Sequence, residues 1–135
     1  MNRIKSLIFL QELYNFKVIK DEFNIEYVVF KNSSFDSIQN IKDKTEFEAI
    51  ENHIHILDGI RKKEFNELVP IAKSLGKSLL SNLKQAYPNK EFIVYVSLDI
   101  YDSFIIRFHQ KWENELPYYE LCELNSETSK LFIFQ

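Results

Sequence analysis

The chain has 135 residues, of which 45% are hydrophobic and 27% charged. These proportions fit a globular domain that buries its own core, and they exclude a disordered or fibrous chain. The formal net charge of -3 argues against a nucleic-acid partner, because phosphate binding requires a concentrated basic surface. The lone cysteine, Cys122, cannot form an internal disulfide, and no apolar run reaches the length of a signal peptide or a membrane span. We therefore expect one cytoplasmic domain over residues 1–135, with no membrane partner.

The first third of the chain predicts one short helix and one hairpin. Apolar residues at helical spacing predict a helix over residues 4–13, and alternating residues predict a β-hairpin over 15–31 that turns at 21–24. Residues 32–44 are mostly polar and predict a loop that holds a short helical turn. The next segment, 45–51, fits a helix and a strand equally well.

The middle of the chain predicts a strand followed by a long helix. Residues 53–56 alternate between histidine and isoleucine, which predicts a half-buried strand with the isoleucines facing inward. Apolar residues recur at three- and four-residue steps from Phe65 to Leu83, with lysines on the opposite side, so this segment predicts an amphipathic helix. Pro70 must lie in its first turn or kink it, and Pro88 marks its end.

The last third predicts further strands. Residues 92–98 and 104–108 show matched alternation around the connection 99–103, which predicts a second hairpin. Residues 118–124 and 131–134 predict two more strands. The fold class is therefore α+β, with a mostly antiparallel sheet and one long amphipathic helix packed across it. A sheet flanked by helices on both faces is the alternative.

The three histidines of the chain carry one functional hypothesis. His53 and His55 lie two apart on the predicted strand and point the same way, so together they could hold one zinc or iron ion. His109 could supply a third ligand if the three rings share a sheet face. This predicts a small metal-binding protein or metal-dependent enzyme. The opposing interpretation is that His53 and His55 simply lie on the polar face of a strand. This interpretation is favoured, because a motif with only two possible ligands is weak evidence for a metal site.

The outward face of the second hairpin carries another hypothesis. Arg107, His109 and Lys111 alternate on one strand, and Tyr95 and Ser97 lie on its neighbour. Such a face could bind an anion or an acidic partner. It could equally be a solvated face, because outward polar residues are usual on half-buried antiparallel strands.

The segment after this hairpin combines acidic and aromatic residues around Pro117. From Glu113 onward the chain contains five glutamates and one lysine. Rigid rings and carboxylates suit the recognition of a basic protein surface, although the same rings could pack beneath a surface loop. The predicted partner contacts are Trp112, Glu113, Glu115, Tyr118, Tyr119 and Glu120, with Tyr95, Arg107 and His109 in second place.

No catalytic template fits the sequence. Two glycines are too few for the Gly-rich dinucleotide motif, and no P-loop, nucleophile elbow or isolated carboxylate pair occurs. Cys122 next to Glu123 is expected to pack and not to react, because a neighbouring carboxylate raises the pKa of a thiol.

In size, acidity and aromatic-acidic composition, the chain resembles small bacterial immunity proteins that neutralise a cognate toxin. The resemblance implies a cytoplasmic, non-enzymatic protein without a cofactor, which binds and blocks a toxin domain such as a basic nuclease. A homodimer interface could use the same aromatic surface.

Overall fold

The computed structural model describes residue 13 and residues 15–135. The helix predicted over residues 4–13 falls outside this part of the chain, except for Leu13, which is buried. In chain order the elements are β1 (Phe16–Lys20), β2 (Glu26–Phe30), α2 (Lys44–Glu51), β3 (His53–Asp58), α3 (Lys62–Ala86), β4 (Phe92–Asp99), β5 (Ser103–Gln110), β6 (Leu124–Asn125) and β7 (Ser129–Phe134).

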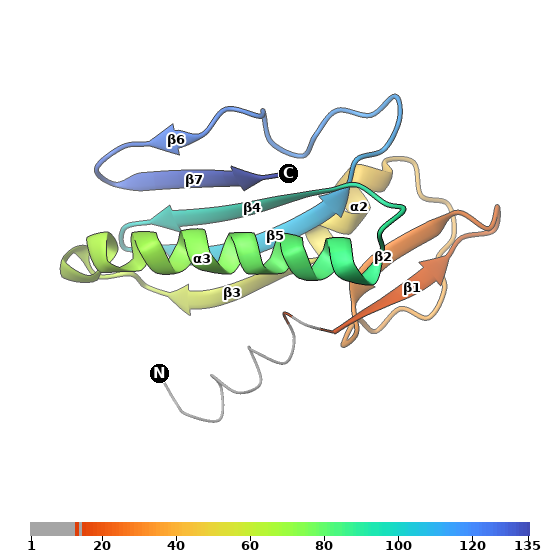
Figure 1. The fold of residues 1–135 in the computed structure, drawn as a ribbon, viewed down its shortest axis with the longest axis horizontal. Coiled ribbons are helices and arrows are strands. Elements are labelled where there is room, and N and C mark those ends of the chain that lie inside the picture. Colours follow the sequence, from red (N-terminus) through yellow and green to blue (C-terminus); the bar gives the residue numbers. More distant parts are fainter. Residues whose placement is uncertain (1–12, 14) are drawn as a thin grey trace.

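The strands form two antiparallel sheets (Figure 1). The larger has five strands in the order β3-β5-β4-β7-β6, and β1 pairs only with β2 in the smaller. In the predicted second hairpin, Val94 pairs with Phe108 and Val96 pairs with Ile106. The first hairpin pairs Phe16 with Phe30. Both predicted hairpins and the α+β class with a mostly antiparallel sheet are confirmed.

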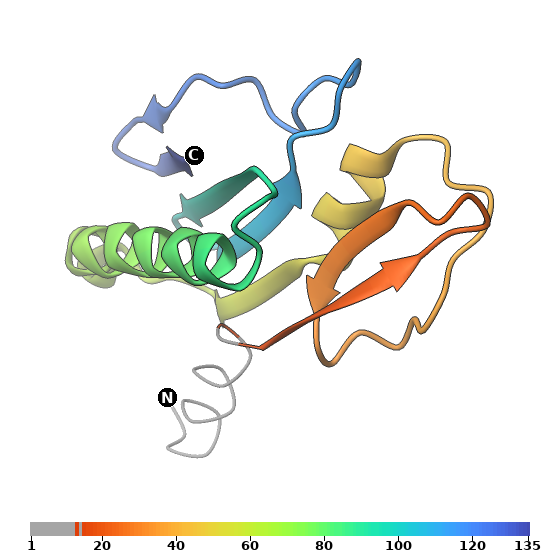
Figure 2. The ribbon, with the colours of Figure 1, turned by 45° about the vertical axis from the view of Figure 1, so that its right-hand side comes forward.

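The main core lies between α3 and one face of the five-stranded sheet. The helix contributes Phe65, Ala72, Leu79 and Leu83, and the sheet contributes alternate residues of β4 and β5, from Phe92 to Leu98 and from Phe104 to Phe108. Figure 2 shows α3 along one side of the sheet, with α2 and the β1–β2 hairpin at the end where β5 finishes. No helix in the described part of the chain combines the length and the apolar character needed to cross a membrane.

Two local predictions are wrong, and a third is narrowed. No helical turn forms over residues 32–43, where the chain instead makes an isolated bridge between Ser37 and Lys20. Of the two alternatives expected for Pro70, the first-turn position does not occur, because Pro70 lies well inside α3. Its exposed position, between turns whose apolar sides are buried in the core, lets the helix continue through it. Residues 118–123 form no strand, and only Leu124–Asn125 pairs with β7.

Gly76 allows α3 to approach β7 closely. It is a buried helical residue, and a Cβ atom built there would overlap the ring of Phe134 on β7. The glycine is therefore required by packing, although alanine is the better helix former.

Replacing Gly76 with alanine is expected to destabilise the protein by about 1–3 kcal/mol, because the Phe134 ring must leave its place in a packed core. Urea unfolding of Gly76→Ala measures this change. Ser74→Ala, an exposed substitution on the same helix, is the matched control and should change stability by less than about 0.5 kcal/mol. A Gly76→Ala variant more stable than the wild type would contradict the packing explanation.

Candidate functional site

The site begins with a buried carboxylate at the junction of the two sheets. Glu48 of α2 is fully buried. Its Oε1 accepts hydrogen bonds from the Gln110 backbone N–H and the Trp112 indole N–H, both at 2.8 Å. Its Oε2 accepts from the Val28 backbone N–H at 2.9 Å and from Gln110 Nε2 at 2.8 Å. One side chain therefore joins β2, the end of β5 and Trp112 to α2.

Asn52, directly after α2, extends this junction. Its side-chain oxygen accepts from the Phe30 N–H at 3.2 Å, and its amide donates to the Val28 carbonyl at 2.8 Å. The Asn52 backbone carbonyl accepts from the Phe108 N–H. β2 has only β1 as a strand neighbour. The buried N–H and C=O groups on its other edge therefore need hydrogen-bond partners that no strand supplies. Glu48 and Asn52 supply the hydrogen bonds that a further strand would make.

The environment of Glu48 shifts its titration. Burial raises the pKa of this carboxyl from 4.5 to about 7, while the hydrogen bonds from Gln110, Val28 and Trp112 favour the ionised form and limit the rise. The carboxyl is enclosed by the backbone of β2 and β5, so no substrate can reach it. We therefore assign Glu48 a structural role.

The β5–β6 connection, residues 111–123, is held against α2 at two points. Trp112 packs against Tyr27 with ring centroids 5.4 Å apart, in addition to its bond with Glu48. Glu115 accepts from the Thr45 N–H at 2.8 Å, the Thr45 hydroxyl at 2.7 Å and the Lys44 N–H at 3.2 Å. Its carboxylate thus lies at the N-terminus of α2, where the helix dipole and free N–H groups favour negative charge.

Two tyrosines hold the next part of the connection on the sheet. The Arg107 guanidinium lies 4.8 Å from the Tyr118 ring centroid and 5.7 Å from that of Tyr119, within cation–π range. Arg107 also donates to the Ala49 carbonyl near the end of α2, and Tyr119 packs edge-on against Tyr95 at 5.1 Å. The rings therefore lie half-buried on the face of the sheet opposite α3, which explains why residues 118–123 form no strand.

His109 is buried beneath this layer. Its Nδ1–H donates to the Gln110 carbonyl at 2.7 Å, and its Nε2 accepts from the Tyr95 hydroxyl at 3.0 Å and from the Tyr118 N–H at 3.3 Å. Burial lowers the pKa of the imidazole. A neutral ring with both nitrogens bonded positions the connection and is not available as a ligand.

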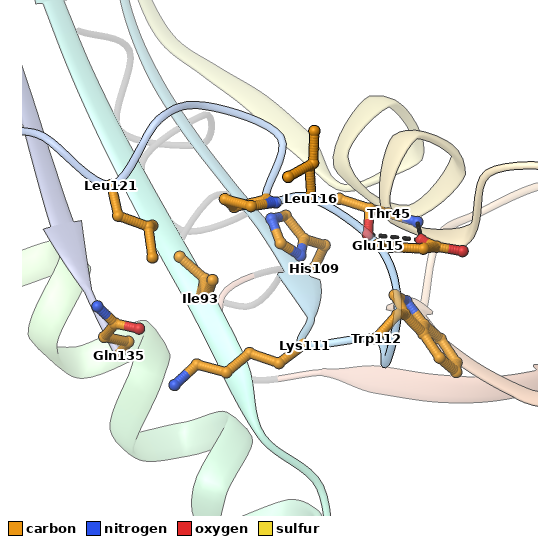
Figure 3. A pocket seen from close by; sticks show the side chains of 10 residues that line it. Thr45, Ile93, His109, Lys111, Trp112, Glu115, Leu116, Leu121 and Gln135 are labelled. Atoms are coloured by element: carbon orange, nitrogen blue, oxygen red, sulfur yellow. Dashed lines mark hydrogen bonds between the residues drawn. The ribbon is translucent and has the colours of Figure 1, made fainter.

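A pocket of about 250 Å³ opens between the connection, β4 and the start of α2 (Figure 3). Leu121 and Ile93 lie on one side of it, and the Glu115–Thr45 pair lies on the other. The lining residues are Thr45, Ile93, His109, Lys111, Trp112, Glu115, Leu116, Pro117, Leu121 and Gln135.

The predicted partner contacts form one cluster, because the connection folds back over the hairpin face. Within it, Tyr95 and His109 are buried, and Trp112, Glu115, Tyr118, Tyr119 and Arg107 are half-buried. Only Glu113 and Glu120 are exposed. Their role in binding a partner stays a prediction. Cys122 is exposed, so the expectation that it packs is wrong.

Sequence reasoning missed Glu48 and the exposed leucines of this surface. Glu48 lies between Phe47 and Ala49 in a segment whose structure the pattern left ambiguous, and a charge between apolar residues was the available signal. Leu116 is 86% exposed and Leu121 49% exposed. Nothing in their sequence context distinguishes them from core leucines.

The structure does not bring the three histidines together. His53 and His55 adjoin each other on β3, with ring centroids 5.3 Å apart. His53 Nδ1 bonds the Ile50 carbonyl and His55 Nδ1 bonds Asp58, whereas His109 is enclosed under the connection. Across residues 13 and 15–135, no three His, Cys, Asp or Glu side chains form a group that could hold a metal ion. The three-histidine geometry that the metal hypothesis requires is therefore absent.

Comparison with known proteins gives one match. Residues 3–134 match the model of the family described as "Uncharacterized protein PM0498". No curated protein and no solved structure matches the chain. Function must therefore be argued from the geometry.

The pH dependence of stability tests the titration of Glu48. Its folded-state pKa lies above the ordinary 4.5, so between about pH 4.5 and 7 the folded state binds more protons than the unfolded chain. The contribution of this group to stability therefore falls as pH rises through that window. The Gln side chain of Glu48→Gln does not titrate, so only the wild type loses this contribution as the pH rises. The difference in unfolding free energy between the wild type and Glu48→Gln should therefore decrease by up to about 3 kcal/mol across the window. Urea unfolding of both proteins at both ends of the window measures this, and a deficit that widens with pH would show that the hydrogen bonds outweigh burial.

Proposed function

The chain belongs to the Uncharacterized protein PM0498 family, and from its geometry we propose that it is a non-enzymatic protein-binding module. Its interface is the outward side of the β5–β6 connection, and its partner presents a basic surface. The specific role we propose is that of an immunity protein, which binds and blocks a cognate toxin domain.

The observation that carries this proposal is an apolar, acidic surface held in one conformation. Leu116, Leu121 and Leu124 are exposed by 86%, 49% and 50%. Exposed apolar side chains grouped on one segment mark interaction sites more often than scattered ones do. Because Trp112, Glu115 and the two tyrosines already hold the connection in place, binding would cost little ordering entropy.

The charge of this surface supports a basic partner. Glu113, Glu120 and Glu123 are exposed on the same stretch of chain as the leucines. The solvent-facing side of α3, across the sheet, carries Lys63, Lys73, Lys77 and Lys84. This separation of charge would steer a basic protein toward the connection and away from α3.

The use of the buried polar groups supports binding over catalysis. Every buried side-chain nitrogen and oxygen in the described part of the chain has a hydrogen-bond partner inside the protein. Glu48, Asn52 and Gln110 direct these bonds to the backbone of neighbouring strands. Such groups support a scaffold, and none of them faces a cleft where a substrate could bind.

The product of the neighbouring gene provides the test, because immunity proteins are encoded beside the toxins that they block. Isothermal titration should give saturable binding of that product to the wild-type chain. Glu113→Lys combined with Glu120→Lys should weaken binding at least about ten-fold, since two interface charges are reversed.

The matched control is Glu67→Lys combined with Asp102→Lys, which reverses two exposed charges on α3 and in the β4–β5 turn. It should bind within about two-fold of the wild type, because exposed charges distant from an interface contribute little to affinity. Equal binding by the Glu113/Glu120 variant and the wild type would refute the interface. A neighbouring product that does not bind would refute the immunity role.

A further inference from the structure

We propose that the pocket beneath the β5–β6 connection receives one apolar side chain of the partner, and that Lys111 pairs with a carboxylate adjacent to that side chain. The inference rests on the proposed function and specifies the chemistry that the partner must present at the centre of the interface.

The walls and the size of the pocket indicate an apolar anchor. Ile93, Leu116, Pro117 and Leu121 supply apolar surface, and Figure 3 shows Leu121 and Ile93 on the same side of the hollow. A volume of about 250 Å³ falls below the range of about 300–1,000 Å³ that is usual for small-molecule sites. It suits a single side chain inserted from outside.

Most polar groups that line the pocket already bond within the protein. Glu115 bonds Thr45, the Trp112 indole bonds Glu48, and both nitrogens of His109 are occupied. Among the side chains that line the pocket, the charged group that remains is the Lys111 ammonium. It lies on an exposed side chain, and no described carboxylate is within ion-pair distance of it. A carboxylate on the ligand would provide the missing partner.

The position of the pocket relative to the exposed leucines is that of an interface hot spot. Leu116 and Leu121 both line the pocket and face solvent, so a partner that covers them would seal the hollow. Anchors that fill such pockets, surrounded by contacts that exclude water, dominate the affinity of many interfaces. The exposed glutamates of the connection, Glu113 and Glu120, would repel a carboxylate whereas Lys111 would attract it, so this pair would set the orientation of the partner.

Three small probes that need no protein partner test the inference by ¹H–¹⁵N NMR titration of the full chain. N-acetyl-leucine carries the apolar group and the carboxylate, N-acetyl-leucinamide only the apolar group, and N-acetyl-alanine essentially only the carboxylate. N-acetyl-leucine should shift the amides of Ile93, His109, Lys111 and Leu121 saturably. N-acetyl-leucinamide should bind the same amides roughly two- to five-fold more weakly, because one exposed charge pair contributes little. N-acetyl-alanine should bind at least about ten-fold more weakly, because it lacks most of the buried apolar area.

Two variants and one control complete the experiment. Lys111→Gln should make N-acetyl-leucine and N-acetyl-leucinamide bind with equal affinity. Leu121→Trp should abolish the binding of both probes, because the larger ring fills the pocket. The control, Lys77→Gln at an exposed site of α3, should leave the affinities of both probes unchanged. The inference is overturned if no probe shifts these amides saturably, or if the acid and the amide bind the wild type equally. Since the probes do not require the toxin-like partner, this failure is distinguishable from failure of the proposed function.

Discussion

The fold depends on one constraint, which is that the N–H groups at the junction of the two sheets need an acceptor. The backbone N–H groups of Val28 and Gln110, the Gln110 amide and the Trp112 indole all point to the same buried place. A carboxylate is the side chain that can accept all four, because each of its oxygens accepts two. Placing a charge there opposes burial, which raises the pKa of Glu48. Removing it would leave four buried donors without partners.

The position of the candidate interface follows from this junction through α2. Glu48 holds the middle of α2 against β2 and β5, and it also holds the Trp112 ring where the β5–β6 connection begins. Glu115 then bonds the N-terminus of the same helix. With these two points held, Tyr118 and Tyr119 lie on Arg107, while Leu116 and Leu121 are left facing solvent. A buried acid–backbone network thus determines which side of the connection is left exposed.

Sequence alone predicts the regular part of this structure. The strands in residues 92–108 and the helix from Phe65 to Leu83 are each buried on one face. Burial on one face produces a regular spacing of apolar residues, which can be read from the sequence. The site is different, because its residues lie in segments without a period. Residues 118–123 look like part of a strand by composition, yet the rings of Tyr118 and Tyr119 lie against the Arg107 guanidinium of β5 instead. His109 occupies an outward position on β5 and is buried only because the connection covers it, which no local pattern encodes. The prediction of a three-histidine metal site is wrong for the same reason, because the connection that encloses His109 separates it from His53 and His55.

The most direct test of the central claim is equilibrium unfolding of Glu48→Ala, followed by far-UV circular dichroism and by the fluorescence of Trp112, the only tryptophan in the chain. If the carboxylate joins the two sheets and holds Trp112, the variant should lose at least about 3 kcal/mol of unfolding free energy, because each buried donor left without an acceptor costs about 1–3 kcal/mol. Its folded-state tryptophan emission should also shift to the red, because the indole loses its acceptor and becomes exposed. The matched variant Glu46→Ala, exposed on the same helix, should keep the wild-type emission. A Glu48→Ala protein with wild-type emission and a stability within about 0.5 kcal/mol of the wild type would contradict the account.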